Sequence, residues 1–248
     1  MKQVSINDRW DLWVPTHRAN RPEWPWWEAT RLAAMSHFIE PLDVVYDIGA
    51  EEGDFPALFA TWGAKVMLVE PNPKVWPNIK AIFEANDLQE MILGSFVGFA
   101  SDVTADATVV DGPMHQEAII RGSAWPECAD GAVIGDHGFR HLAEETDTTP
   151  QMTIDRMVSL WNFEPPNHIT MDVEGSEMRV LKGAEATIQA FRPYVWISIH
   201  ADAMRTMYGN DPQEISAFFR LLNYEEIFLS YDHESHYLFI PTEMCWVL

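Results

Sequence analysis

Residues 44–55 read VVYDIGAEEGDF, and this stretch decides the fold. An apolar run ends in the acid Asp47, turns through Gly49 and Gly53, and enters a segment whose apolar residues have helical spacing. Glycines let the backbone adopt conformations that a side chain forbids, and the helix that follows offers free N–H groups. The stretch therefore predicts a strand, a ligand-binding turn and a helix.

A second apolar run, residues 65–72 (KVMLVEPN), places Glu70 at the carboxyl end of the next strand. An acid at that point can accept both hydrogen bonds of a ribose diol. Nicotinamide enzymes share this acid, but they favour a G-x-G-x-x-G turn that seats a pyrophosphate. Here the turn reads G-A-E-E-G. Glu51 and Glu52 would repel a pyrophosphate and tolerate a sulfonium, which favours S-adenosylmethionine over a dinucleotide.

The rest of the chain alternates short apolar runs with helical stretches, which is typical of βαβ units and a parallel sheet. We expect strands at 43–48, 65–69, 92–99, 168–173 and 194–200, and helices at 154–161, 176–191 and 212–222. Strands near 226–230 and 236–240 would form an antiparallel C-terminal hairpin. Residues 101–150 lack a sustained period and are interpreted as loops and hairpins.

Residues 1–40 differ from the remainder, so we divide the chain into a Trp-rich cap at 1–40 and a main domain at 41–248. Five tryptophans lie among prolines in the first part: Trp10, Trp13, Trp24, Trp26 and Trp27. We expect an irregular arm leading into a helix over 25–39. The aromatic side chains would pin the arm to the core, in preference to covering a ligand pocket.

The chain of 248 residues carries a formal net charge of −22, all of it from beyond residue 40. This acidic protein lacks the clustered Lys and Arg of a nucleic-acid interface, so a nucleic-acid partner is disfavoured. No stretch has the length and apolar character of a membrane span, and the N-terminus does not resemble a secretion signal, so we expect a cytoplasmic protein. Cys128 and Cys245 stand far apart, which argues against a disulfide framework or a thiolate zinc site.

Five stretches together carry a family resemblance. They are VVYDIGAEEGDF, VMLVEPNP, FVGFASD, MTIDRMVSL, and ITMDVEGSEMRVLKGAEATI followed by RPYVWISIH. In this order they resemble the FkbM family of S-adenosylmethionine-dependent methyltransferases, over roughly residues 43–241. The resemblance implies an α/β, Rossmann-like class I methyltransferase fold. Its sheet would be mostly parallel and seven-stranded, with helices on both faces and an antiparallel C-terminal hairpin.

The resemblance also implies S-adenosylmethionine as cofactor and a set of residues that bind it. Asp47 and the glycines would line its methionine part, Glu70 would hold its ribose and Asp102 would reach the adenine edge. The full set is Asp47, Gly49, Ala50, Gly53, Glu70, Pro71, Ser101, Asp102 and Asp172. The chain departs from the family at Glu51 and Glu52, where an Asn-containing turn is common, and at Thr170 and Met171, where a lysine often precedes the acid.

Asp172, Glu174 and His200 lie at the carboxyl ends of predicted strands and are the candidate catalytic residues, because ligands of parallel sheets bind at that edge. Methyl transfer to a hydroxyl requires removal of one proton, and the ordinary pKa of histidine favours His200 as the base. A histidine bonded at a strand end is the alternative. Asp172 and Glu174 could bind a cation, orient a substrate or cap the next helix, whereas Glu177 is interpreted as structural.

We do not expect a metal cofactor, although Mg²⁺ at the two carboxylates is an open alternative. His137 and His141 have a spacing that can ligate zinc, but they lack a third ligand of recognisable spacing and are interpreted as loop residues. His233 and His236 are interpreted as polar turn residues.

The expected reaction is methyl transfer from S-adenosylmethionine to a hydroxyl of a sugar or small metabolite. The alternatives are a nicotinamide-dependent oxidoreductase and a catalytically idle Rossmann-like binding module. The sequence leaves the acceptor and the oligomeric state open.

Overall fold

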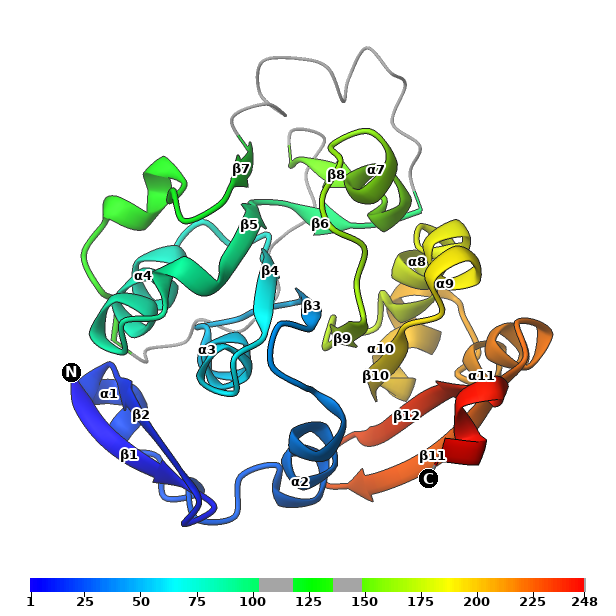
Figure 1. Cartoon of the computed structure of the whole chain (residues 1–248), viewed down its shortest axis with the longest axis horizontal. Helices are drawn as coiled ribbons and strands as arrows, with labels where there is room; N and C mark the ends of the chain where they lie inside the picture. The colour runs from blue at the N-terminus through cyan, green and yellow to red at the C-terminus, as the bar shows by residue number, and fades with distance from the viewer. Residues whose placement is uncertain (103–117, 136–148, 248) are drawn as a thin grey trace.

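A computed structural model describes residues 1–102, 118–135 and 149–247, and its centre is a mixed β-sheet (Figure 1). Within these residues the sheet has eight strands in the order β11-β12-β10-β9-β3-β4-β5-β7. The strands are β3 (Val44–Ile48), β4 (Lys65–Val69), β5 (Ile92–Phe96), β7 (Ile119–Arg121), β9 (His168–Met171), β10 (Tyr194–Ile199), β11 (Tyr224–Tyr231) and β12 (Ser235–Pro241).

The five central strands, β10 to β5, pair in parallel, and the three outer pairings are antiparallel. The prediction of an α/β fold is confirmed. The predicted number of seven strands was wrong, because the described residues form a mixed sheet of eight. The additional strand is β7, which lies in the stretch interpreted as loops. Three residues are too few for a hydrophobic period to show, so β7 is recognisable only through its pairing with β5.

Alternate residues of each strand point to opposite sides, and in the central strands β3, β9 and β10 both sets are almost entirely buried. Val44 and Tyr46 pack with the helices α7 (Ile154–Ser159), α8 (Glu177–Lys182), α9 (Glu185–Phe191) and α11 (Gln213–Leu221). Val45 packs on the other side with α2 (Ala29–Phe38), α3 (Asp54–Thr61) and α4 (Trp76–Ala85). Shorter elements are α1 (Thr16–Ala19), α10 (Ala201–Ala203), a π-helical turn at Met204–Tyr208, and 3₁₀ turns at Gln89–Met91, Glu127–Asp130 and Thr242–Val247.

The N-terminal segment is ordered as a β-hairpin, which corrects the expectation of an irregular arm. Strands β1 (Lys2–Ile6) and β2 (Trp10–Val14) pair antiparallel around a turn in which Asn7 and Asp8 are left-handed. Alternate residues of both strands are buried in the same cluster as residues of α3 and α4. Figure 1 shows the hairpin beside these two helices. The overlooked signal was the alternation of apolar residues on both sides of a turn that begins with Asn7: Val4 and Ile6 precede it, and Leu12 and Val14 follow it.

Three predicted boundaries are also corrected. Helix α2 begins at Ala29 instead of Pro25, because Glu28 is left-handed and cannot lie inside an α-helix. The strand expected at 92–99 ends at Phe96, and the short strand β6 (Phe99–Ala100) leaves the main sheet to pair with β8 (Gln151–Met152).

The helix expected over 176–191 divides into α8 and α9 at Gly183. The Gly183 carbonyl accepts a hydrogen bond from the Asp155 backbone at 3.0 Å, so it does not continue the helix. The Asp155 carboxylate then caps α9, accepting from the backbone N–H groups of Ala186 and Thr187. A Cβ on Gly183 would lie 2.0 Å from the carbonyl oxygen of Ser101, so this glycine permits close packing.

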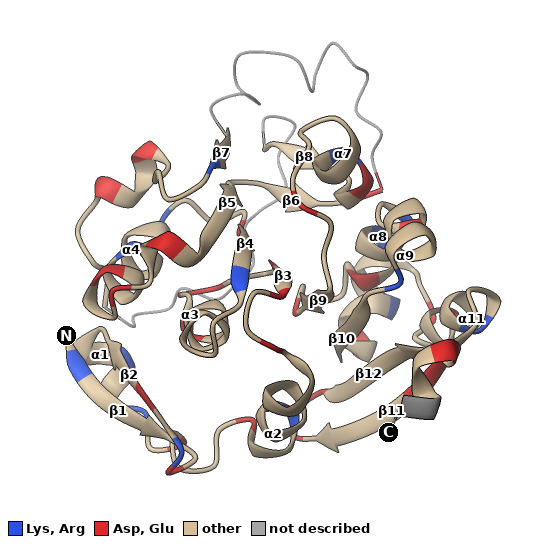
Figure 2. Ribbon diagram, in the orientation of Figure 1, with Lys and Arg blue, Asp and Glu red and all other residues tan. Residues whose placement is uncertain are grey.

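Acidic side chains are spread over the described ribbon, including the loops beside β3 and β9 (Figure 2). Among the described residues, no helix combines the length and hydropathy needed to cross a bilayer. Cys128 and Cys245 are free thiols.

Candidate functional site

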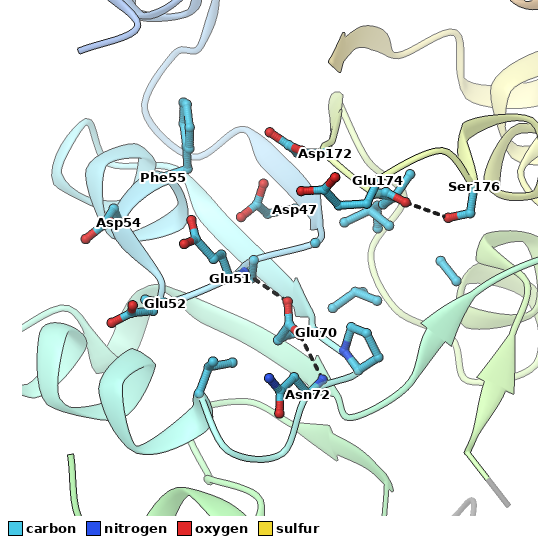
Figure 3. Close-up of a pocket in the computed structure, with 18 of the residues that line it drawn as sticks. Asp47, Glu51, Glu52, Asp54, Phe55, Glu70, Asn72, Asp172, Glu174 and Ser176 are labelled. Atoms are coloured by element: carbon cyan, nitrogen blue, oxygen red, sulfur yellow. Dashed lines mark hydrogen bonds between the residues drawn. The ribbon is translucent and has the colours of Figure 1, made fainter. Parts of the chain in front are cut away.

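A cavity of about 300 Å³ lies at the carboxyl ends of β3, β4 and β9 (Figure 3). Asp47 is the penultimate residue of β3, Glu70 follows β4 and Asp172 follows β9, so neighbouring parallel strands bring three carboxyl groups to one edge of the sheet. Of the predicted cofactor residues, those that line the cavity are Asp47, Gly49, Ala50, Glu70, Pro71 and Asp172. This is the edge at which open α/β sheets bind their ligands.

Gly53, Ser101 and Asp102 do not line this cavity as the described residues define it. Gly53 stands at the N-terminus of α3 with a φ of 93°. Ser101 donates from its hydroxyl to Gln151, and Asp102 accepts from the guanidinium of Arg179 at 3.2 Å. The contact of Asp102 with an adenine therefore stays a prediction.

Gly49 is required by packing at the tip of β3. Its φ is 88°, and a Cβ would lie 2.0 Å from the backbone oxygen of Asp172. Its N–H group and that of Ala50 both donate to the carbonyl of Val69. The glycine thus lets the carboxyl ends of β3, β4 and β9 approach one another closely. Its role at the site is to permit this close approach.

Glu70 is held in place by two backbone donors. Its carboxylate accepts from the N–H of Glu51 at 3.0 Å and from the N–H of Asn72 at 2.8 Å (Figure 3). Burial raises the pKa of Glu70 to about 8, in spite of these two hydrogen bonds. A buried carboxyl group fixed in this way at the cavity wall can accept hydrogen bonds from a ligand's hydroxyl groups.

Asp47 has one occupied and one free carboxylate oxygen. Oδ1 accepts a hydrogen bond from the hydroxyl of Thr170, and Oδ2 has no hydrogen-bond partner among the described residues. Burial raises the pKa of Asp47 to about 7, opposed by the Thr170 bond and the charge of Arg31. A buried acceptor without a donor is costly, so Oδ2 favours a ligand that donates a hydrogen bond or carries positive charge.

Glu51 and Glu52 are not the free charges that the sequence suggested. The buried guanidinium of Arg18, 1% exposed, lies 3.1 Å from Glu51 and 3.5 Å from Glu52, and it also contacts Asp54. Glu52 receives a further hydrogen bond from the side-chain amide of Asn78 at 2.6 Å. This turn would therefore repel a pyrophosphate less strongly than its sequence suggests, because an arginine from the N-terminal segment partly compensates the charge of the two acids.

The three candidate catalytic side chains lie together, as predicted. Nε2 of His200 is 3.4 Å from Asp172 and 3.6 Å from Glu174, and it contacts Glu234. Nδ1 of His200 is 2.8 Å from Glu177, which is completely buried. Asp172 and Glu174 line the cavity, whereas His200 stands behind them.

The surroundings of His200 favour its cationic form. Burial alone would lower the pKa of His200, but hydrogen bonds to Glu177 and Glu234 and the charge of Asp172 raise it to about 11. An imidazolium has no lone pair with which to accept a proton. This environment therefore favours a role in balancing charge and positioning carboxylates over the predicted role as base.

Arg31 was not identified from the sequence, although it lines the cavity. Its guanidinium, which is buried, donates to the hydroxyl of Ser198 at 2.9 Å and lies 3.9 Å from Asp172. Ser198 in turn donates to Asp172 at 3.2 Å. A polar residue in the otherwise apolar strand 194–199 is the one local signal that pointed to this contact.

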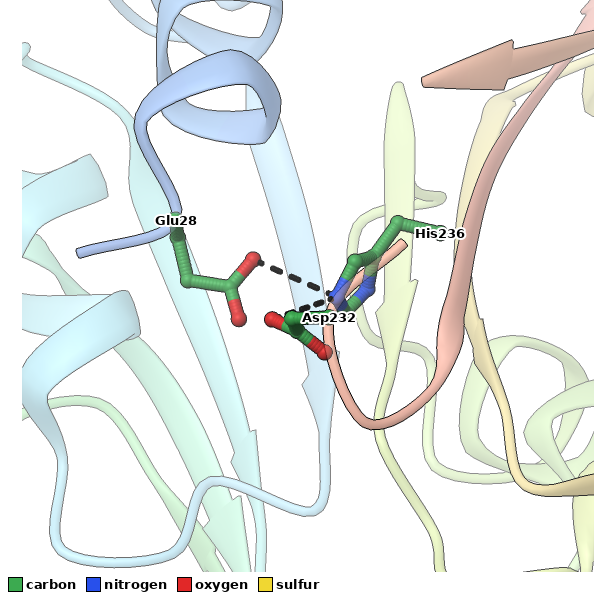
Figure 4. A group of neighbouring side chains, drawn as sticks. All are labelled: Glu28, Asp232 and His236. Atoms are coloured by element: carbon green, nitrogen blue, oxygen red, sulfur yellow. Dashed lines mark hydrogen bonds and ion pairs between the residues drawn. The ribbon is translucent and has the colours of Figure 1, made fainter. Parts of the chain in front are cut away.

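His236 is fully buried, which corrects its interpretation as a polar turn residue. It lies beside Glu28 and Asp232, so residues from the two ends of the chain meet (Figure 4). Of these three residues, Glu28 lines the cavity. His233, by contrast, is largely exposed, as expected of a turn residue. His137 and His141 lie outside the described residues.

Comparisons with known proteins agree with this architecture. A family model described as the methyltransferase FkbM domain matches residues 47–226. Among solved structures the chain is similar to the methyltransferase FkbM from Methylobacillus flagellatus KT, with 17% identity and a TM-score of 0.51. That match covers 80% of this chain and 43% of the other, so the chain spans less than half the length of that protein.

Two further structures show weaker likeness. The Methanococcus jannaschii fibrillarin pre-rRNA processing protein has 11% identity and a TM-score of 0.47, over 83% of this chain and 69% of that one. The M. capricolum TrmK structure in complex with S-adenosyl-homocysteine has 12% identity and a TM-score of 0.43, over 86% and 67%. No curated protein matches the chain.

Proposed function

Since the chain belongs to the FkbM methyltransferase domain family, we propose that it transfers a methyl group from S-adenosylmethionine to a hydroxyl of a small molecule or glycan. One observation carries the proposal. Two buried carboxyl groups, Asp47 and Glu70, lie at the carboxyl ends of neighbouring parallel strands and face one cavity, and one oxygen of Asp47 has no hydrogen-bond partner among the described residues.

The residues fit the cofactor chemically. Oδ2 of Asp47 can accept from the ammonium of the methionine part, and Glu70 can accept from the ribose hydroxyls. Ala50 and Pro71 supply apolar contacts at the same wall. S-adenosylmethionine, when bound, supplies an electrophilic methyl group on a positively charged sulfur, and an acid-lined cavity favours that charge.

The acceptor would bind on the side of Asp172, Glu174 and Glu234, where Trp27 and Phe55 also line the cavity. The protein must hold the hydroxyl in line with the methyl group and remove its proton. Asp172 is a better candidate for this base than His200. Its side chain is 36% exposed, yet burial of its carboxyl and the charge of Glu234 raise its pKa to about 7, near the pH at which proton transfer occurs.

The acidic cavity also bears on the class of acceptor. Its lining carries Glu28, Asp172, Glu174 and Glu234 against the cations Arg21 and Arg31. Phosphate-rich acceptors would be repelled by this excess, whereas neutral polyols can donate hydrogen bonds to carboxylates. Together with the net charge of −22, this favours a small hydroxyl compound or glycan over nucleic acid.

Calorimetric titration with S-adenosylhomocysteine tests the proposal directly. Binding is expected for the wild-type protein and for Asp172→Asn, and its loss is expected for Asp47→Ala. Incubation of host extracts with isotopically labelled cofactor should then give labelled products with wild type and none with Asp172→Asn. Stabilisation by NADH but not by S-adenosylhomocysteine would reverse the assignment in favour of an oxidoreductase.

A further inference from the structure

Glu28, Asp232 and His236 form a compact group that the proposed methyl transfer does not use (Figure 4). Nε2 of His236 lies 3.3 Å from Oδ2 of Asp232 and 3.7 Å from Oε2 of Glu28. One ligand atom from each side chain lies within 4.8 Å of the other two. Asp232 and His236 flank the turn between β11 and β12, whereas Glu28 precedes α2, so the group joins distant parts of the chain.

The histidine ring is oriented as in a metal site. The side chain of His236 is 1% exposed, and its Nδ1 lies 3.1 Å from the hydroxyl of Ser198. That contact fixes the ring, so that Nε2 is the nitrogen directed at the two carboxylates. Histidines that bind metals characteristically use their second ring nitrogen for such an orienting hydrogen bond.

Glu28 supplies an independent indication of a ligand. Its side chain is only 9% exposed and points toward Asp232 and His236 (Figure 4). Oε2 has no hydrogen-bond partner among the described residues. Nε2 of His236 and the guanidinium of Arg31 each lie 3.7 Å from this oxygen, and Arg31 directs its hydrogen bond to Ser198 instead. A buried carboxylate oxygen left in this state needs a cation or a donor.

We propose that Glu28, Asp232 and His236 bind a divalent transition-metal ion of the Zn²⁺ or Mn²⁺ type. One imidazole nitrogen and two carboxylate oxygens suit these ions, whereas Mg²⁺ prefers oxygen ligands alone. The ion would tie the N-terminal segment to the β11–β12 turn. Because Glu28 and Glu234 line the cavity, it would also fix the wall on the acceptor side. Binding of the ion does not depend on the proposed methyl transfer.

Titration of the chelator-treated full chain with ZnCl₂ and MnCl₂, followed by calorimetry, tests this site. One ion per chain is expected, and saturation should raise Tm. The isosteric variant Glu28→Gln should weaken binding at least about tenfold, and His236→Asn should do the same. His233→Asn and the double variant His137→Asn/His141→Asn are the matched controls and should bind as wild type. Loss of binding in either control, with retention in Glu28→Gln, would overturn the assignment.

X-ray absorption at the zinc edge gives a readout that does not depend on any variant. The expected first shell holds one imidazole nitrogen with oxygen atoms and no sulfur. A sulfur ligand, or no uptake of either ion by the folded wild-type protein, would remove the site. S-adenosylhomocysteine binding measured on the same metal-free sample separates this outcome from a failure of the proposed function.

Discussion

The guanidinium of Arg18 lies 3.1 Å from the carboxylate of Glu51, and this contact joins the N-terminal segment to the turn that follows β3. Arg18 precedes the region matched by the family model, and Glu51 lies within it. The backbone N–H of Glu51 also donates to Glu70. The arginine therefore supports the residue that positions the acid of the cofactor cavity.

Replacing Arg18 with methionine should destabilise the protein by about 3 kcal/mol, because it leaves Glu52 and Asp54 buried without their cation. Affinity for S-adenosylhomocysteine should fall as the turn loosens. Denaturant unfolding and calorimetry measure the two effects. Arg9→Met removes an exposed arginine from the same segment and is the control. Equal effects of both variants would contradict the role given to Arg18.

Glu70 predicts how stability depends on pH. Its pKa in the folded, ligand-free protein is about 8, above the ordinary value of 4.5, so the folded state holds its proton more tightly than the unfolded state. Stability from this group is complete below the unfolded pKa and is lost as pH rises through the folded one. The Tm of the ligand-free protein should therefore fall between about pH 4.5 and about pH 8.

The variant Glu70→Gln should make this fall shallower, with Asp47 and Asp172 accounting for the remainder, and should abolish cofactor affinity, whereas Glu90→Gln, at an exposed position, should change neither. Thermal scans across the pH range measure the slope. A wild-type slope that survives in Glu70→Gln would assign the dependence to other groups.

Thr170→Val should raise the pKa of Asp47 further, because it removes the hydroxyl that bonds to Oδ1 while conserving volume. More of Asp47 would then be protonated at neutral pH. Affinity for S-adenosylmethionine should fall about fivefold near pH 7, as expected for a pKa that rises from about 7 by about one unit, and recover near pH 9. Thr187→Val alters a buried threonine far from the cavity lining and should leave affinity unchanged. A loss that does not recover at high pH would point to a packing defect.

Gly183→Ala should cost about 1–3 kcal/mol, because the added Cβ would lie 2.0 Å from the Ser101 carbonyl oxygen and force α8 away from it. Gly135→Ala is the matched control, since no atom lies within 4 Å of a Cβ built there. Equilibrium unfolding of the two variants provides the comparison. Equal stability of both would show that the backbone near Ser101 relaxes freely.

The sequence by itself determined the parallel centre of the sheet and the two acids at its edge. Asp47 and Glu70 were identified because each ends a short apolar run followed by a turn, and that pattern is written in neighbouring residues. The strand at 65–69 agrees with the prediction to the residue. The family resemblance was confirmed because it rests on the same contiguous stretches.

Only the tertiary structure decided which distant side chains complete the site. Arg18 contacts Glu51, Arg31 contacts Ser198, and Glu28 lies beside His236, which comes from the other end of the chain. Hydrophobic periodicity indicates which face of a helix or strand is buried, but it does not indicate which charged side chain, distant in the sequence, packs between two elements. That choice depends on long-range packing, which also surrounds His200, the predicted base, with carboxylates.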